Sequence, residues 1–330
     1  MDTRRLSVSQ IEEAGTLLAE CHRDHSPLGA THVLASQPAA AQMVAAAIEG
    51  GVGYAAMQGS TLAGFFIAPF PSMPGPTSSR LGMAHHAAKA SESRSAYRAL
   101  YQAAAGDLVA AGITYHSLPV LADHANAVEA FFELEFGIDQ IDGLLRLPSD
   151  QSTAPVPAGV RDATDVDVDA VVDLAIELQR FHSRSPMFQA ALGFDVTGIR
   201  RGVETALRVD RSVVVVIEDD DRVVGMAQAG PAGAYLDTVD IGMNVITDGA
   251  RSQGLGTAML RHLLKWAASV RYRYCAVGWT SSNLLSDAFY RSRGFTPVRF
   301  RLHRRIDPRI SWANDALDDS NFGHRRRNDN

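Results

Sequence analysis

The chain has 330 residues, of which 46% are hydrophobic and 21% charged, so it is long enough for two domains with sizeable cores. Its formal net charge of -6 and its pI of about 6.0 argue against a partner held through nucleic-acid phosphates. The two cysteines, Cys21 and Cys275, form no disulfide or metal pattern, which indicates a reducing compartment. The first residues lack the apolar core of a signal peptide, and no apolar run approaches membrane-spanning length. We therefore expect a cytoplasmic protein with neither a membrane nor a nucleic-acid partner.

Hydrophobic periodicity and turn residues predict alternating helices and strands in the first half of the chain. Helices are expected at 9–24, 39–48, 95–111 and 125–134, and strands at 54–57, 62–68, 81–88, 115–121 and 143–147. Prolines predict a loop at 69–76 and, among small polar residues, a linker at 148–159. The first domain is therefore expected to cover residues 1–147.

The same order of elements starts again after the linker, which predicts a diverged duplication. The expected helices are 166–181, one that begins near Gly256 and one that contains Phe289. The expected strands are 160–161, 213–217, 222–227, 239–247, 274–279 and 298–303. We expect the second domain to cover 160–311, followed by a polar, disordered tail over 312–330.

A glycine-rich stretch between strand 239–247 and the following helix predicts an anion site. It reads Arg251-Ser252-Gln253-Gly254-Leu255-Gly256-Thr257. The first amides of a helix have no acceptor within the helix, and the helix dipole adds partial positive charge there. Glycines let a phosphate approach the backbone closely. A nucleotide P-loop is excluded because no lysine follows Gly256, and a dinucleotide fingerprint is excluded because Met259 replaces its third glycine.

The pattern Arg/Gln-x-x-Gly-x-Gly/Ala that remains resembles the coenzyme A loop of the GNAT superfamily of N-acetyltransferases. Downstream, Asn283, the pair Phe289-Tyr290 and the pair Gly294-Phe295 resemble the closing signature of that family, with the strand 274–279 in between. The resemblance implies an α/β (α+β) fold of two tandem GNAT-like domains. Each domain would have a mixed, mostly antiparallel central sheet flanked by helices. It also implies acetyl-CoA as co-substrate, without a metal.

The resemblance also assigns roles to residues of the second half. The backbone of Asn244, Val245 and Ile246 would bind the pantetheine arm and the thioester oxygen in a splay beside the central strand. The glycine-rich loop would hold the diphosphate through Arg251, Ser252, Gln253, Gly254, Leu255, Gly256 and Thr257. Asn283 would hydrogen-bond the cofactor, or cap a helix, or do both. Tyr290 would be the general acid toward the coenzyme A sulfur, because a phenol with a pKa of about 10 is protonated at neutral pH; otherwise it is a packed aromatic.

The general base and the acceptor site are less sharply defined by the sequence. Asp240 is expected on the same strand face as Ile246 and stands where many relatives carry an acid; Asp237 is an alternative, and either could be a solvated strand residue. In many relatives the segment after the first helix lines the acceptor site, which indicates five residues or else a plain loop anchored by Pro186. They are His182, Arg184, Ser185, Met187 and Phe188.

A basic stretch follows the closing signature. Its arginines could meet the 3′-phosphate of the coenzyme or an acidic acceptor, but their alternation with apolar residues favours a solvated strand face. They are Arg291, Arg293, Arg299, Arg301, Arg304, Arg305 and Arg309.

The first half lacks the groups that the chemistry needs. Phe132 is expected where Tyr290 stands in the second half, and a phenyl ring has no proton to give. The segment 87–95 stands where the phosphate loop should be, contains no glycine, and carries Glu92, which would repel phosphate. We therefore expect the first half to be a degenerate acetyltransferase domain and the second to be catalytic.

The sequence as a whole predicts an acetyl-CoA-dependent N-acetyltransferase. The acetyl group would pass directly to a primary amine of a small molecule or a peptide. The alternative is a non-catalytic acyl-CoA sensor or assembly protein, in which Tyr290 only packs. A metal role is not expected, because Cys21, His22 and His25 have no evident fourth ligand and neighbouring His85 and His86 would point to opposite faces of a strand.

Overall fold

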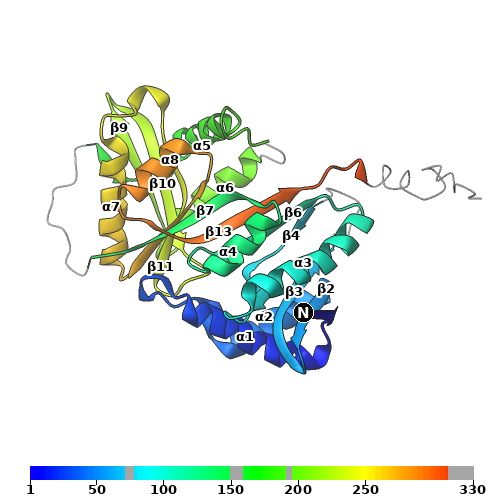
Figure 1. Cartoon of the computed structure of the whole chain (residues 1–330). Helices are drawn as coiled ribbons and strands as arrows, with labels where there is room; N and C mark the ends of the chain where they lie inside the picture. The colour runs from blue at the N-terminus through cyan, green and yellow to red at the C-terminus, as the bar shows by residue number, and fades with distance from the viewer. Residues whose placement is uncertain (71–77, 149–158, 191–194, 311–330) are drawn as a thin grey trace, which may run out of the picture. The chain divides into compact units, whose positions relative to one another are not determined.

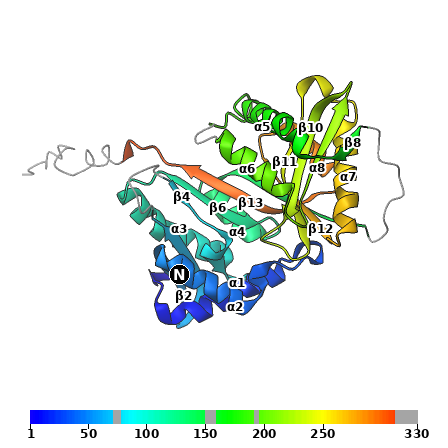
Figure 2. The ribbon, with the colours of Figure 1, turned by 180° about the vertical axis from the view of Figure 1, so that it is seen from behind.

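The computed structural model describes residues 1–70, 78–148, 159–190 and 195–310 (Figures 1 and 2). The predicted tail at 312–330, nearly all of the predicted linker and most of the predicted loop at 69–76 lie outside these ranges. Within these ranges, no helix has both the length and the apolar character needed to cross a membrane.

The chain runs twice through one order of elements: a strand, two helices, three strands, a helix, a strand, a helix and a strand. The first run is β1 (Asp2–Arg5), α1 (Ile11–Asp24), α2 (Gln37–Glu49), β2 (Gly51–Gln58), β3 (Thr61–Pro69), β5 (His86–Ala88), α3 (Ser93–Ala110), β6 (Tyr115–Leu121), α4 (Ala125–Glu133) and β7 (Gly137–Arg146), with the short strand β4 (Ser78–Arg80) added before β5. The second run is β8 (Val160–Asp162), α5 (Val168–His182), α6 (Val196–Ala206), β9 (Val213–Asp219), β10 (Arg222–Pro231), β11 (Thr238–Ile246), α7 (Leu255–Ser269), β12 (Tyr274–Thr280), α8 (Leu284–Arg291) and β13 (Thr296–Arg305). The predicted fold class, with tandem sheets flanked by helices, is confirmed.

Several elements differ from the sequence prediction. The strand predicted at 81–88 is wrong over most of its length, because the amide of His85 donates to the carbonyl of Gly82 at 3.1 Å and closes a short 3-10 turn there. Gly82 in turn donates its amide to Nδ1 of His85 at 3.1 Å. Only the last three residues form β5. The strand β1 and the helix α6 were not predicted, although Asp195 accepts the amide of Thr197 at 3.0 Å, which is the N-cap signal for α6.

The structure divides into two compact units whose boundaries do not follow the two halves of the sequence. The first unit contains Met1–His25, Leu34–Ile138 and the described residues from Phe300 onward. The second contains Ser26–Val33 and Asp139–Arg299. The second unit therefore includes most of β7 and a short segment from near the start of the chain.

The first unit contains an antiparallel sheet in the order β1-β2-β3-β5. Its helices α1 and α2 pack on one face and α3 packs on the other (Figure 1). The core on the α3 face is aromatic: Tyr97 and Tyr101 of α3 lie against Phe66 of β3 and Phe131 of α4, all nearly inaccessible to solvent. Burial of such rings from water is the main stabilising term of a core of this kind.

The second unit is built on the strand order β7-β12-β11-β10-β9-β8. All neighbouring strands in this series are antiparallel except β11 and β12, which are parallel. Helices α5 and α6 cover one face, where Val171 and Val203 pack with Val214 and Met226, and α7 covers the other (Figure 2). The period-2 alternation of a strand therefore supplies two apolar faces, as expected for a sheet between two helical layers.

The parallel strands β11 and β12 separate part way along their length. They are paired from Thr238–Ile241 opposite Tyr274–Val277, and no pairing joins β11 to β12 beyond Ile241. Beyond that point the backbone groups on the facing edges of the two strands do not pair with each other. Unpaired backbone amides and carbonyls are free to form hydrogen bonds with another partner. An extended ligand can therefore bind in this splay between β11 and β12.

A β-bulge also lies at this point of β11. Ile241 stands opposite Ala229, but Met243 stands opposite Gln228, so Gly242 is an extra residue. An extra residue shifts the alternation of side chains along a strand. Asp240 therefore shares its face with Met243 and not with Ile246, and the prediction that Asp240 and Ile246 share a face is wrong.

The last helices of the two runs, α4 and α8, show that the predicted equivalence of Phe132 and Tyr290 needs a correction. The amide of Phe295 donates to the carbonyl of Tyr290 at 3.2 Å, and the amide of Phe136 donates to the carbonyl of Phe131 at 3.0 Å. Phe131 therefore takes the buried place of Tyr290, whereas Phe132 is 44% exposed. The predicted equivalence of Phe132 and Tyr290 is wrong by one residue, but a phenyl ring stands there in either case.

Candidate functional site

The start of α7 is an open helix mouth. Its N-cap residue Gly254 has φ +82°, and a Cβ built on it would meet no atom within 4 Å. A Cβ on Gly256 would instead approach the Phe289 ring to 3.3 Å, so this glycine lets α8 pack close to the helix start. The first amides of α7 lack acceptors within the helix and carry about half a positive charge from the helix dipole. This mouth is suited to an anion.

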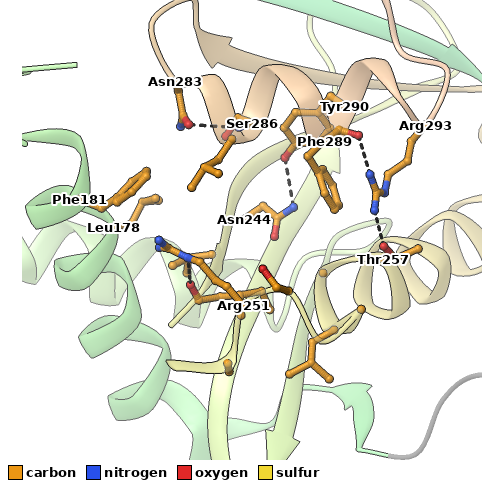
Figure 3. A pocket seen from close by; sticks show the side chains of 18 residues that line it. Leu178, Phe181, Asn244, Arg251, Thr257, Asn283, Ser286, Phe289, Tyr290 and Arg293 are labelled. Atoms are coloured by element: carbon orange, nitrogen blue, oxygen red, sulfur yellow. Dashed lines mark hydrogen bonds between the residues drawn. The ribbon is translucent and has the colours of Figure 1, made fainter. Parts of the chain in front are cut away.

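A cavity of about 440 Å³ lies at this mouth, with walls from α5, the end of β11, the loop before α7 and α8 (Figure 3). It brings together most of the residues predicted as cofactor-binding or catalytic. These are Asn244, Val245, Ile246, Arg251, Ser252, Gly254, Leu255, Gly256, Thr257, Asn283 and Tyr290. Two predicted residues lie elsewhere: Gln253 donates its side-chain amide back to the carbonyl of Gly249 at 3.4 Å, and Asp240 lines a different cavity.

Sequence reasoning missed several residues of this wall: Leu178, Phe181, Ala250, Leu285 and Ser286. Phe289 and Arg293, which also line it, were named only as part of the closing signature and of the basic stretch. Phe181 lies near the end of α5 and supports the loop before α7, because the guanidinium of Arg251 stacks 4.5 Å from its ring centre. Arg251 also donates to the carbonyl of Ile246 at 3.0 Å and pairs with Asp248 at 2.5 Å. A helical hydrophobic position such as Phe181 carries no sequence signal for this contact.

Arg293 is a charged residue that connects α8 to the start of α7. Its guanidinium lies 3.7 Å from the ring centre of Phe289, and it donates to the carbonyl of Phe289 at 2.9 Å and to the hydroxyl of Thr257. Figure 3 shows Arg293 and Thr257 on the side of the cavity opposite Phe181. Its buried Nε has no partner among the described residues, and burial lowers the pKa of Arg293. The interpretation of Arg293 as part of a solvated strand face is therefore wrong.

Tyr290 lies near the C-terminal end of α8, and only 5% of its surface is exposed. Its hydroxyl oxygen accepts a hydrogen bond from Nδ2 of Asn244 at 3.1 Å (Figure 3). Its ring stacks on Trp279, with ring centres 5.4 Å apart. Burial raises the pKa of Tyr290 to about 12. The phenol is therefore protonated at neutral pH, and because its oxygen is the acceptor from Asn244, its own proton is available.

Asn283 begins the helix that carries Tyr290. Its side-chain oxygen accepts the amide of Ser286 at 3.1 Å, which is an N-cap hydrogen bond. The residue is buried and also lines the cavity. Its carboxamide nitrogen makes no hydrogen bond with the described part of the chain, so the cap leaves a donor for a ligand.

A second cavity, of about 370 Å³, lies beside Asp240. Its walls come from β7, the loop between β10 and β11, β11, β12 and the start of β13. The Asp240 side chain is exposed there, yet surrounding protein raises its pKa, first by burial and then through the charge of Asp142. Asp237, the alternative base, lines neither cavity, and its carbonyl is occupied by the amides of Arg273 and Tyr274 at 2.8 and 3.2 Å.

The Tyr290 phenol and the Asp240 carboxylate lie on opposite faces of the sheet. Asp240 is paired with Ala276 on β12, whereas Trp279, which stacks on Tyr290, stands three residues further along that strand and so on its other face. The charge of Asp240 nevertheless contributes to the raised pKa of Tyr290. The splay between β11 and β12 lies between them.

The wall of the second cavity is held by the segment Ser26–Val33. The amide of Val33 donates to the carbonyl of Ala234 at 2.9 Å, and the amide of Leu236 donates to the carbonyl of Thr31 at 3.0 Å. The first half of the chain thus supplies a support for this cavity that no sequence motif indicated.

The five residues predicted from the segment after α5 line neither cavity. In the described ranges, no group of three or more His, Cys, Asp or Glu side chains could hold a metal ion.

Comparison with known proteins shows which family and which solved structures the chain resembles. Residues 179–295 match the model of the acetyltransferase (GNAT) family. A GCN5-related N-acetyltransferase from Sphaerobacter thermophilus has 14% identity and a TM-score of 0.58, and the match covers 92% of this chain and 95% of that one. A tandem GNAT protein from the clavulanic acid biosynthesis pathway has 15% identity and a TM-score of 0.55 over 93% and 98% of the two chains. A GNAT-family acetyltransferase from Colwellia psychrerythraea has 10% identity and a TM-score of 0.50 over 93% and 100%.

Residues 179–295 are therefore similar to the acetyltransferase (GNAT) family, and the chain has the tandem GNAT fold. The family uses acetyl-CoA and an acceptor as its two substrates. No curated protein matches the chain.

Proposed function

We propose that the protein is an acetyl-CoA-dependent N-acetyltransferase that transfers the acetyl group directly to an amine, with its active site in the second unit. The observation that carries this proposal is the hydrogen bond between Asn244 and Tyr290. It holds a protonated phenol at the inner wall of a cavity whose outer wall is a helix mouth. A packed aromatic alone needs neither the hydroxyl nor its partner.

The diphosphate of acetyl-CoA binds at the start of α7, where the amides following Ser252 and the helix dipole favour negative charge. Arg251 and Arg293 add positive charge on either side of this mouth. The pantetheine arm runs along the unpaired edge of β11 at 244–246, where backbone groups replace the missing strand contacts. The thioester then lies at the splay, within reach of Tyr290.

The reaction needs a neutral amine and a protonated leaving group. Asp240 takes a proton from the acceptor's ammonium, and its raised pKa makes it a stronger base than an ordinary aspartate. The amine nitrogen attacks the thioester carbon, the C–N bond forms and the C–S bond breaks. The departing thiolate takes the proton of Tyr290, and the phenolate regains a proton through solvent from the nitrogen as the amide forms.

The experiment is release of free thiol from acetyl-CoA in the presence of an amine panel, with the acetylated amine detected by mass. We expect turnover for the parent and a strong loss for Tyr290→Phe, while both bind acetyl-CoA with similar affinity in calorimetry. Binding of acetyl-CoA without any acetylated product across the panel would contradict the proposal and favour the acyl-CoA sensor.

A further inference from the structure

The cavity beside Asp240 contains two charged side chains of opposite sign that have bonding capacity left. Asp240 makes no hydrogen bond and no ion pair with any described residue. Arg299, on β13, donates its Nε to Asp142, and its two terminal nitrogens have no partner in the part of the chain that the structure describes. A free carboxylate and a free guanidinium edge therefore belong to one cavity of about 370 Å³.

The floor between these charges is made of small residues. Asp240 pairs with Ala276 on β12, and Asp142 of β7 pairs with Gly278, two residues further along. A Cβ on Gly278 would lie 2.9 Å from the Asp142 carboxylate and 2.7 Å from the amide nitrogen of Gln140. The glycine thus leaves room for Asp142 at the floor, and Asp142 in turn fixes the guanidinium of Arg299.

The separation of these groups suits a small molecule. Asp240 and Asp142 stand two strands apart, which corresponds to about 10 Å between their backbones across the sheet. The Arg299 guanidinium and the Asp240 carboxyl line the same cavity, and the positive charge of Arg299 counters the rise in the pKa of Asp240. Because both groups line one cavity of about 370 Å³, a compact ligand can contact both of them.

Arg299 is oriented to receive an anion. Its Nε is taken by Asp142, so the edge formed by its two terminal nitrogens is the one that remains. That edge matches a carboxylate, which accepts two parallel hydrogen bonds from a guanidinium. A ligand whose ammonium meets Asp240 would carry such an anion at its other end.

Building on the proposed function, we propose that the acetyl acceptor is a small zwitterion of the amino-acid class. Its ammonium is held by Asp240 and its carboxylate by the terminal nitrogens of Arg299. The volume of the cavity is in the range of small-molecule sites. A protein lysine side chain brings an ammonium but no carboxylate, and would leave Arg299 unused.

The test compares matched acceptors with the full-length protein and acetyl-CoA. Each amino acid is paired with the amine that lacks only its carboxylate: β-alanine with ethylamine, 4-aminobutyrate with propylamine, phenylalanine with phenethylamine. We expect at least one amino acid to be acetylated with a kcat/KM at least about tenfold above that of its paired amine, since a charge-assisted bidentate contact is typically strong enough for this ratio.

Two variants then test whether Arg299 causes the preference for the amino acid over its paired amine. Arg299→Gln should bring the ratio between acid and amine close to one, chiefly through a higher KM for the acid, whereas Arg261→Gln, an equal loss of charge on the exposed face of α7, should keep the parent's ratio. Equal use of both members of every pair overturns the inference, as does acetylation confined to amines without a carboxylate. Either result leaves the proposed function standing, because an amine is still acetylated; if Arg299→Gln does not fold, the parent's ratios alone decide.

Discussion

Asn244 donates its side-chain amide to the hydroxyl oxygen of Tyr290 at 3.1 Å, and this bond joins the free end of β11 to α8. It crosses between the strand that leaves the parallel pairing and the helix that closes the family signature. Because the phenol oxygen accepts from Asn244, its proton can point toward a thiolate in the cavity. The bond thus sets the position of the Tyr290 hydroxyl and leaves its proton free for the proposed donor role.

Replacement of Tyr290 by phenylalanine should remove the acid without reshaping the site. We expect kcat to fall by about 10²-fold to 10⁴-fold, the usual contribution of a positioned general acid. Stability should fall by about 1 kcal/mol, because the Asn244 amide loses its partner. Steady-state kinetics and thermal unfolding check both effects, and a parent-like kcat would exclude Tyr290 as the acid.

The rate should not fall through ionisation of Tyr290 over the ordinary alkaline range. Burial raises the pKa of Tyr290 to about 12, so the phenol keeps its proton up to a pH near that value. The kcat profile of the parent should therefore stay level from neutral pH to the highest pH at which the protein remains folded. A descending limb near pH 10 that disappears in Tyr290→Phe would show instead an unshifted phenol.

The Asp240→Asn variant tests whether Asp240 is the base and how ionisation of its carboxyl changes the stability of the protein with pH. The pKa of Asp240 is raised, so the folded state binds a proton more tightly than the unfolded state. Stability due to this group is therefore present at low pH and decreases as the pH rises through the folded-state pKa. We expect Asp240→Asn to match the parent in acid and to melt above it at neutral pH.

The same variant should lose the acid limb of the kcat/KM profile. In the parent this limb should lie above the ordinary pKa of an aspartate, since burial and Asp142 both raise the pKa of Asp240. Asp237→Asn is the matched control and should keep the limb. If Asp240→Asn retains the parent's profile, another group is the base.

A matched pair at Gly254 separates backbone strain from charge at the helix mouth. Asn and Asp both tolerate the left-handed backbone at this position, and the space beside it is open. We expect Gly254→Asp to bind coenzyme A about tenfold more weakly than Gly254→Asn, a difference of ~1.4 kcal/mol from repulsion of the diphosphate. Calorimetry at low salt measures both; equal affinities would place the diphosphate elsewhere.

Arg293→Met keeps an apolar stem over Phe289 and removes the charge. Because the Nε of Arg293 is unpartnered among the described residues of the cavity wall, we expect the affinity for coenzyme A to fall by about tenfold, within the range for hydrogen bonds to charged groups. Pantetheine, which has no phosphates, should bind the variant and the parent alike. A parallel loss for pantetheine would mean that Arg293 only supports the packing of α8.

The sequence by itself determined the fold class and most of the first cavity. A glycine-rich turn at a helix start and an Asn/Tyr/Gly-Phe signature are local patterns, and their geometry follows from a few neighbouring residues. Local sequence is therefore enough to place Gly254, Gly256 and Asn283, because φ, close approach and capping are short-range constraints.

Only the tertiary structure decided the second cavity and the supports of the first. The bulge at Gly242 moved Asp240 to the face opposite Ile246, and bulges depend on strand pairing that spacing cannot show. Asp142 and Arg299 come from β7 and β13, and they meet only because the sheet brings distant strands together. Long-range register, set by burial of whole faces, is the physical reason that these contacts leave no local trace in the sequence.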